Sequence, residues 1–166
     1  QQGYELATIQ AKGTARTQVQ AAPKALPENP LPPTTQSTQP AVSLTLQGGA
    51  MSRDATREAI WLINGKAMKS EDGHAQHTPL FRLRAGESID VQVDNQTMWH
   101  HPLHFHGVWL RQKTGDQLGP VRDTVFLQPR EKLAVRLYAD QPGRWMVHCH
   151  VLGHQAHGMM GHFEVA

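Results

Sequence analysis

The chain of 166 residues is long enough for one domain with a sizeable core, with room for a piece of another. Its formal net charge is +2, and lysine and arginine are scattered without runs, so neither nucleic acid nor an anionic membrane is indicated as a partner. No apolar stretch approaches the roughly 20 residues of a membrane span. The single cysteine cannot form a disulfide within the chain, which leaves packing, nucleophilic attack or metal ligation as its chemistry.

The N-terminal part of the chain divides in two. Residues 1–16 alternate weakly around Tyr4, Leu6 and Ile9, which fits one strand without a partner nearby or, equally, a disordered tail. Residues 17–40 are rich in glutamine, proline, threonine and alanine and almost lack large apolar side chains, so they cannot bury enough surface to form a core. We therefore interpret them as an interdomain linker.

Residues 41–166 carry the pattern of a folded β domain. Short apolar runs alternate with polar residues at 42–46, 60–63, 81–83, 89–93, 124–127, 133–137, 145–150 and 160–165. Asn64-Gly65 marks a turn after the second run, while 52–58 fits either a helical turn or a loop. Short strands at this spacing, separated by glycine and proline, predict an all-β sandwich of the Greek-key type. Three tryptophans are predicted to belong to its core: Trp99, Trp109 and Trp145.

The cysteine lies in the segment 148–159, His-Cys-His-Val-Leu-Gly-His-Gln-Ala-His-Gly-Met. A thiolate with two imidazoles and a weakly bound thioether is the ligand set of a blue-copper site, because soft sulfur favours copper. Cys149, His154 and Met159 would supply three of these ligands, so a second histidine must come from elsewhere in the chain.

That histidine is available in the segment 101–107, His-Pro-Leu-His-Phe-His-Gly. In a strand, this segment places His104 and His106 on one face, while His101 serves a different centre. The same alternation sends Cys149 to one side and its two flanking histidines to the other. The sequence therefore predicts two metal centres joined by one covalent step.

Other metals fit these segments less well than copper. Zinc also binds cysteine and histidine, but its structural sites usually employ more than one cysteine and seldom an axial methionine. Iron of the facial-triad kind needs a carboxylate, and none lies between Gln141 and Phe163. His100 is the alternative to His101 as a ligand, but the spacing to Pro102 favours His101.

The two segments closely resemble copper motifs of the multicopper oxidases, the family of laccases and related metallo-oxidases. The matching patterns are His-Pro-x-His-x-His-Gly and His-Cys-His-x-x-x-His-x-x-x-x-Met. The resemblance implies type 1 copper ligands at His101, Cys149, His154 and Met159, a type 2 ligand at His104, and type 3 ligands at His106, His148 and His150. It further implies a cupredoxin fold for 41–166, with 1–16 as the closing strand of a preceding middle domain.

The resemblance also implies an activity and partners. In this family the type 1 copper takes electrons singly from phenols, aromatic amines or low-valent metal ions, and a trinuclear cluster reduces dioxygen to water. That cluster needs roughly twice the histidines present here, which the family draws from two His-x-His motifs of an N-terminal domain. No such motif occurs outside the two segments. We expect the N-terminal and middle cupredoxin domains of the parent protein as partners, and a periplasmic or secreted location.

Reduction of dioxygen also consumes protons, which requires a relay. Several bacterial members of the family carry a carboxylate directly after the second type 1 histidine, but Gln155 occupies that position here and cannot titrate. Asp123, in the segment Arg-Asp-Thr-Val, is our candidate for the relay. The predicted catalytic residues are Cys149, His148, His150 and Asp123.

Two other functions also fit the sequence. An isolated electron-transfer domain with only the blue copper would absorb visible light intensely without consuming oxygen. Alternatively, identical domains could meet face to face as a homo-oligomer and pool four histidines from each copy, namely His104, His106, His148 and His150. A copper-free structural role is opposed by the full blue-copper ligand set.

Overall fold

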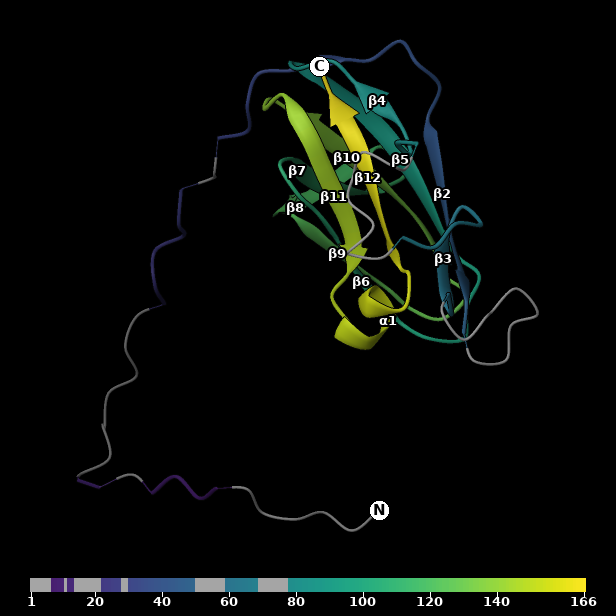
Figure 1. The fold of residues 1–166 in the computed structure, drawn as a ribbon. Helices are drawn as coiled ribbons and strands as arrows, with labels where there is room; N and C mark the ends of the chain where they lie inside the picture. Colours follow the sequence, from purple (N-terminus) through teal and green to yellow (C-terminus); the bar gives the residue numbers. More distant parts are fainter. Residues whose placement is uncertain (1–6, 11, 14–21, 28–29, 50–58, 69–77) are drawn as a thin grey trace.

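A computed structural model of the protein describes residues 7–10, 12–13, 22–27, 30–49, 59–68 and 78–166. Two β-sheets lie face to face, and a short helix lies at one end of the sandwich (Figure 1). The larger sheet contains β1 (Thr35–Gln36), β2 (Val42–Gly48), β3 (Trp61–Ile63), β5 (Glu87–Asn95), β7 (Trp109–Thr114), β8 (Gln117–Arg122) and β10 (Lys132–Ala139). The smaller sheet contains β4 (Arg82–Leu83), β6 (His101–Phe105), β9 (Thr124–Leu127), β11 (Gly143–Cys149) and β12 (Met160–Val165).

The strand order confirms the predicted all-β sandwich. The larger sheet runs β3-β2-β5-β10-β7-β8, with β1 also paired to β5, and the smaller runs β4-β12-β11-β6-β9. Helix α1 (Leu152–Ala156) connects β11 to β12. Neighbouring strands are often distant in sequence, as the crossed connections of a Greek key require. Within the described residues, no helix has the length and apolar character that a membrane crossing needs.

The core lies between the two sheets and follows the alternation of the strands. In β5 the buried apolar side chains are Ile89, Val91 and Val93, and Val135 of β10 pairs directly with Val91. The smaller sheet contributes aromatic rings, among them Phe163, which is fully buried. This packing gives β6 and β11 one face in the core and one face outside it.

Several elements differ from the sequence-based expectation. The hairpin of β7 and β8 was not predicted, because most of its side chains are polar and lie at the edge of the larger sheet. Strand β1 falls within the segment predicted as a linker, where it runs parallel to the start of β5. No strand occurs among residues 7–10 and 12–13. The rest of the expected closing strand and the segment 52–58 lie outside the described residues, so the domain boundaries stay a prediction.

The prediction that three tryptophans lie in the core was wrong for two of them. Trp109 is 45% exposed and Trp99 is 37% exposed, whereas Trp145 is partly buried against the core. Trp109 begins β7 with its side chain outward, since the next residue, Leu110, takes the inward position and is fully buried. Trp99 precedes β6 and contacts Trp61 edge-on, with ring centroids 5.2 Å apart.

Two turns depend on backbone angles that favour glycine. The predicted turn at Asn64-Gly65 is confirmed, with φ of 51° and 73° at the two residues. Gly107, directly after β6, has φ of 66°, and a Cβ there would lie 2.0 Å from Cδ2 of Trp145. Glycine therefore ends the motif 101–107 because both the chain direction and the adjacent indole exclude a side chain.

Substitution of this glycine should destabilise the domain through both effects. We expect Gly107→Ala to lower the free energy of unfolding by about 1–2 kcal/mol for the left-handed backbone and by a further 1–3 kcal/mol or so for the forced contact with Trp145. Gly115→Ala is the matched control, because Gly115 has φ of 60° but nothing within 4 Å of the added carbon. Urea denaturation of the copper-free chain measures both, and equal losses would contradict the role of Trp145.

Candidate metal centre

The adjacent strands β6 and β11 carry four of the eight predicted metal ligands, and His106 and His150 follow directly after them. They run antiparallel, with His148 opposite His104 and Cys149 opposite Leu103. Because successive side chains of a strand point to opposite faces, Cys149 points into the core with Leu103, and His148 points the other way with His104. One pair of strands therefore presents two groups of ligands, as the alternation in the sequence predicted.

The inner group consists of one thiol and two imidazoles. Cys149 Sγ lies 3.6 Å from His101 Nδ1 and 3.7 Å from His154 Nδ1, and the two nitrogens are 3.1 Å apart. Metal–nitrogen bonds of about 2.0 Å and metal–sulfur bonds of about 2.3 Å place neighbouring donors at such separations. These residues fit a single ion, and they form the group of three metal-ligating side chains found among the described residues.

The segment after β11 brings the last two ligands to this group. Helix α1 starts after Val151, and the His154 amide donates to the Val151 carbonyl at 2.9 Å. The chain then turns back, so that the Met159 amide donates to the His154 carbonyl at 2.9 Å and the Cys149 amide donates to the Met159 carbonyl at 3.1 Å. Met159 is fully buried in the same core as Cys149, so the residue predicted as the axial ligand lies beside the inner group.

Burial sets the protonation of the inner group. Loss of solvent raises the pKa of the Cys149 thiol to about 11, opposed by a hydrogen bond from the Val151 amide to the sulfur. The same loss of solvent lowers the pKa of His101 to about 3, helped by the nearby His154 and His100. The pKa of His154 is lowered by burial and then by His100. The imidazoles are thus neutral, the form that binds metals, while a metal must displace the thiol proton.

Trp61 is a neighbour of the inner group that the motifs did not reveal. Its ring lies 4.0 Å from the His154 ring and 5.3 Å from the His101 ring, measured between centroids. Trp61 comes from β3 in the other sheet, and nothing in its local sequence indicates this contact. His100, in contrast, is exposed and stacks on Phe126 at 5.4 Å, so His101 is the histidine that faces the cysteine, as predicted.

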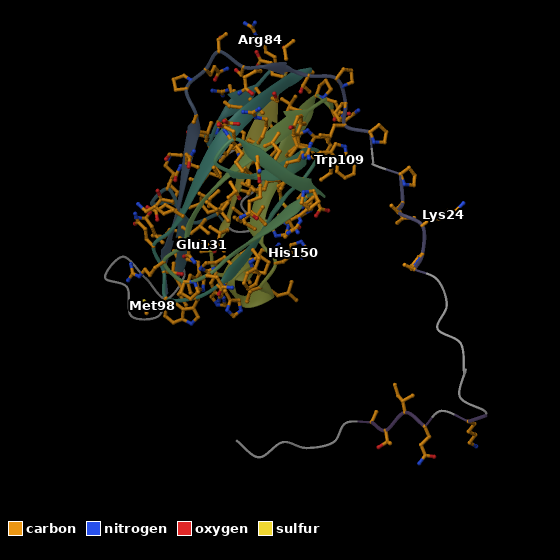
Figure 2. All side chains as sticks on the ribbon, turned by 180° about the vertical axis from the view of Figure 1, so that it is seen from behind. Lys24, Arg84, Met98, Trp109, Glu131 and His150 are labelled. Atoms are coloured by element: carbon orange, nitrogen blue, oxygen red, sulfur yellow. The ribbon has the colours of Figure 1, made fainter. Side chains whose placement is uncertain are left out.

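The outer group consists of four histidines, His104, His106, His148 and His150. Ring centroids lie 4.6 Å apart for His104 and His106 and 5.1 Å apart for His148 and His150. The Nε2 atoms of His106 and His148 are 3.0 Å apart. Burial lowers the pKa of both, and neighbouring histidines add to this shift. His150 follows the end of β11 and is exposed, at the end of the sandwich away from Arg84 (Figure 2).

Backbone carbonyls orient two of these rings. His104 Nδ1 lies 3.0 Å from the Asp123 carbonyl, and His148 Nδ1 lies 3.2 Å from the Cys149 carbonyl. Because a carbonyl can only accept, each ring carries its proton on Nδ1 and has its lone pair on Nε2. Both Nε2 atoms are therefore available to a metal on the outer face.

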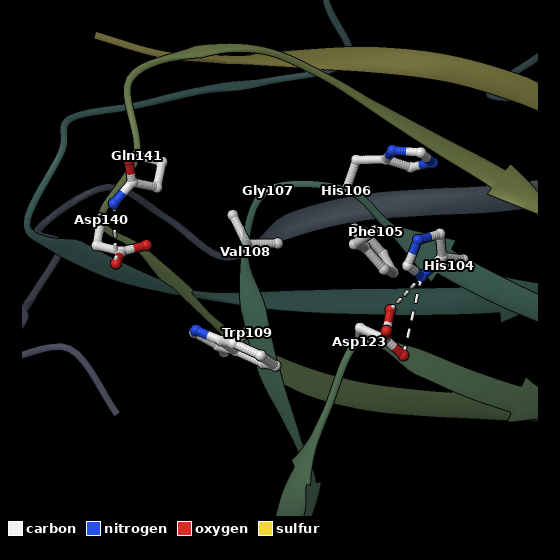
Figure 3. A pocket seen from close by; sticks show the side chains of 9 residues that line it. All are labelled: His104, Phe105, His106, Gly107, Val108, Trp109, Asp123, Asp140 and Gln141. Carbon is white, nitrogen blue, oxygen red and sulfur yellow. Dashed lines mark hydrogen bonds and ion pairs between the residues drawn. The ribbon is translucent and has the colours of Figure 1, made fainter. Parts of the chain in front are cut away.

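A cavity of about 440 Å³ adjoins the outer group. It is lined by His104, Phe105, His106, Gly107, Val108, Trp109, Asp123, Asp140 and Gln141 (Figure 3). The predicted relay residue, Asp123, is 59% exposed, and its Oδ1 lies 3.9 Å from His104 Nδ1. Asp140, directly after β10, is a second carboxylate in the same cavity, and it lies outside both motifs, so they did not indicate it.

The buried imidazole of His101 predicts a pH dependence of stability. The unfolded chain protonates it below its ordinary pKa of 6.5, whereas the folded state resists protonation down to about pH 3. The contribution of His101 to the free energy of unfolding is therefore fully present above pH 6.5. It is lost as the pH falls from 6.5 to about 3, by about 1.4 kcal/mol per pH unit. Urea denaturation of the copper-free chain at pH 7.5 and pH 5 should show a smaller acid loss in His101→Gln. His157→Gln, at an exposed histidine, should keep the wild-type loss, and an equal loss in all three proteins would contradict the assignment.

Several known proteins are similar in sequence to this chain. Residues 35–166 match a family model described as multicopper oxidase. The multicopper oxidase MmcO of Mycobacterium tuberculosis is 37% identical over 100 residues, covering 60% of this chain and 18% of that protein. Copper resistance protein A of Pseudomonas syringae pv. tomato is 38% identical over 84 residues, covering 50% of this chain and 14% of that protein. The chain thus spans less than a fifth of these curated relatives.

Solved structures agree with both the fold and the family. A multi-copper oxidase from Pseudomonas Thermotolerans has a TM-score of 0.68 and 25% identity, over 85% of this chain and 33% of its own. Lac15 from a marine microbial metagenome has a TM-score of 0.60 and 30% identity, over 93% of this chain and 33% of its own. The sandwich is therefore cupredoxin-like, as predicted, and the buried cysteine with its two histidines and methionine resembles a type 1 copper site. With its family model matched across 35–166, the chain belongs to the multicopper oxidases.

Proposed function

We propose that this chain is the C-terminal cupredoxin part of a laccase-like multicopper oxidase, which couples one-electron oxidation of a donor to reduction of dioxygen to water. The observation that carries the proposal is the pair of ligand groups on opposite faces of β6 and β11. Copper held by the inner and outer groups would supply the one-electron transfer and the reduction of dioxygen. The roles of the residues follow from their positions.

The two groups are connected at a single residue. Cys149 is bonded through the main chain to both His148 and His150, and its carbonyl accepts a hydrogen bond from His148 Nδ1 at 3.2 Å. Cys149 is fully buried, so the connection between the faces runs through the interior and avoids solvent. This arrangement supports a role for Cys149, His148 and His150 in passing electrons between the two groups.

The outer group supplies only part of a trinuclear copper site. We propose that His104 serves as the type 2 ligand and that His106, His148 and His150 serve as type 3 ligands. Further histidines would come from an N-terminal domain that docks beside the cavity of Figure 3. The solved relatives support this view, since the chain covers only a third of their length. A periplasmic or secreted location stays a prediction.

The class of electron donor is inferred from the axial ligand. The names of relatives include copper resistance, iron transport and laccase, so they do not select one donor class. The sequence has no methionine-rich insertion, which favours organic donors. A thioether at Met159 stabilises oxidised copper, so easily oxidised phenols and aromatic amines are the donors we expect.

The type 1 assignment is tested by copper loading. Loading the chain with copper should give an intense visible band, because only a thiolate ligand produces the strong sulfur-to-copper absorption of a blue site. Cys149→Ser should abolish the band, since the hydroxyl does not replace the thiolate. Met159→Leu should keep the band and raise the reduction potential, while the neighbouring buried Met160→Leu leaves both unchanged. A blue band in the serine variant would contradict the ligand set.

The relay is tested in the oxygen-consuming preparation. If Asp123 delivers protons, Asp123→Asn should slow oxygen reduction by at least about tenfold, since general acids contribute at least that much. Anaerobic reduction of the type 1 copper should stay unchanged, because it takes up no proton from this cavity. Asp140→Asn is the control within the same cavity. Equal slowing of both steps in Asp123→Asn, or equal slowing of oxygen reduction in both variants, would refute the assignment.

The completeness of the inner group supports a second candidate function. All the inner ligands come from this chain, so a blue-copper electron carrier needs no other domain. Intact-mass analysis of the active preparation, combined with oxygen uptake on a phenolic donor, separates the two functions. Oxygen uptake together with a polypeptide carrying two His-x-His motifs supports the oxidase. A blue preparation of this chain alone, without oxygen uptake, supports the electron carrier.

A further inference from the structure

A buried hydrogen-bond network lies behind His101, on the side away from the cysteine. Thr97 Oγ1 lies 2.7 Å from His101 Nε2 and 2.8 Å from Asn95 Oδ1. Asn95 Nδ2 donates to the carbonyls of Trp99 and Gln128, both at 2.7 Å. Asn95 and His101 are fully buried and Thr97 is 2% exposed. No solvent is therefore available to satisfy these polar atoms in a different way.

The neighbours of Asn95 fix the orientation of its amide. The carbonyls of Trp99 and Gln128 only accept, so the amide NH₂ must face them. The amide oxygen then faces Thr97, whose backbone N–H donates to it at 3.0 Å. Turning the amide over would set its oxygen against two carbonyl oxygens and its NH₂ against an N–H, so that all three of these hydrogen bonds are lost.

The amide in turn fixes the hydroxyl proton of Thr97. A hydroxyl has one proton, and two acceptors face this one: Asn95 Oδ1 at 2.8 Å and the Trp99 carbonyl at 3.1 Å. If the proton pointed to His101 instead, the hydroxyl oxygen would lie 2.8 Å from the amide oxygen with no proton between them. Thr97 therefore accepts from His101, and the imidazole carries its proton on Nε2.

The tautomer decides which nitrogen is available to a metal. With the proton on Nε2, the lone pair of His101 lies on Nδ1, 3.6 Å from Cys149 Sγ. We propose that Thr97 and Asn95 are positioning residues of the type 1 site, which fix the tautomer of His101 and hold its ring toward Cys149. The tautomer is a property of the copper-free protein, while its effect on copper rests on the proposed function.

Main-chain contacts make the network rigid. The backbone N–H of Asn95 donates to the Glu131 carbonyl at 2.9 Å, and the backbone N–H of Arg130 donates to the Thr97 carbonyl at 3.2 Å. The segment between β5 and β6 is thus tied to the segment between β9 and β10. The ring of His101 is therefore held by the segment directly before its own motif, which is itself tied to the more distant segment between β9 and β10.

The first test is the tautomer in the copper-free chain, read from the nitrogen chemical shifts and couplings of the imidazole in ¹⁵N NMR. Wild-type protein should show His101 protonated on Nε2. Thr97→Val, which removes the hydroxyl at nearly constant volume, should populate the Nδ1–H form, and Thr97→Ser should restore the wild-type tautomer. An Nδ1–H imidazole in wild type, or an unchanged tautomer in the folded valine variant, would overturn the proposal.

The second test is copper binding by the same proteins. Loss of such a supporting partner typically weakens metal affinity by roughly 10–100-fold, so Thr97→Val should show a loss of that size and an altered visible band and EPR spectrum. Thr97→Ser should recover both. Unaltered affinity and spectra in the valine variant would show that the contact is merely structural and would overturn the positioning role.

Thr124→Val is the matched control, because the Thr124 hydroxyl lies 3.1 Å from Nδ1 of His104 in the outer group. This variant should leave the tautomer of His101 and the blue band unchanged. If Thr97→Val does not fold, Thr97→Ser and the wild-type tautomer still decide the question: loss of the Nε2–H form in the serine variant counts against the proposal. Failure of every protein to form a blue site, with the tautomer as expected, would refute the proposed function and leave the positioning of His101 intact.

Discussion

The antiparallel register of β6 and β11 is the constraint on which the rest of the site depends. His148 pairs with His104 and Cys149 pairs with Leu103, so the strand pair presents sulfur on one face and imidazoles on the other. A slip of one residue would exchange the two faces, because the side-chain period of a strand is two. Pairing of β12 with β11 and of β9 with β6 fixes this register from both sides. The chemistry is therefore specified by backbone hydrogen bonds before any metal is present.

Burial then gives the two groups different properties. The inner donors are enclosed by the core, which keeps the Cys149 thiol protonated and the His101 imidazole neutral. Only a cation that competes strongly for sulfur displaces that proton, so the apolar surroundings themselves favour a soft metal. Two of the outer histidines, His104 and His106, line an open cavity to which solvent has access. One group is suited to holding an electron and the other to exchanging substrates with solvent.

The sequence predicted the residues that lie within the two motifs, and it did not predict the residues outside them that contact the site. The eight predicted metal ligands lie in two short segments, and alternation along a strand was sufficient to sort those of β6 and β11 onto two faces. Trp61 contacts the same site from the other sheet, and only the packing of the two sheets brings it there. Thr97 lies just four residues before His101, but it stands outside the motif and no pattern marks its contact with the ring. The hairpin of β7 and β8 escaped prediction for another reason: at a sheet edge, polar side chains remove the apolar alternation that marks a strand.

The two ligand groups differ in how far the described residues complete them. The inner group closes within the chain, since the turn after α1 returns Met159 to Cys149 through a backbone hydrogen bond. Under the proposed function the outer group would be incomplete, because four imidazoles cannot satisfy three metal ions, each of which needs several ligands. His104 and His106 line the cavity that the exposed Trp109 also borders. Aromatic side chains of this kind are enriched where proteins meet, so the surface that lacks ligands also has the character of an interface.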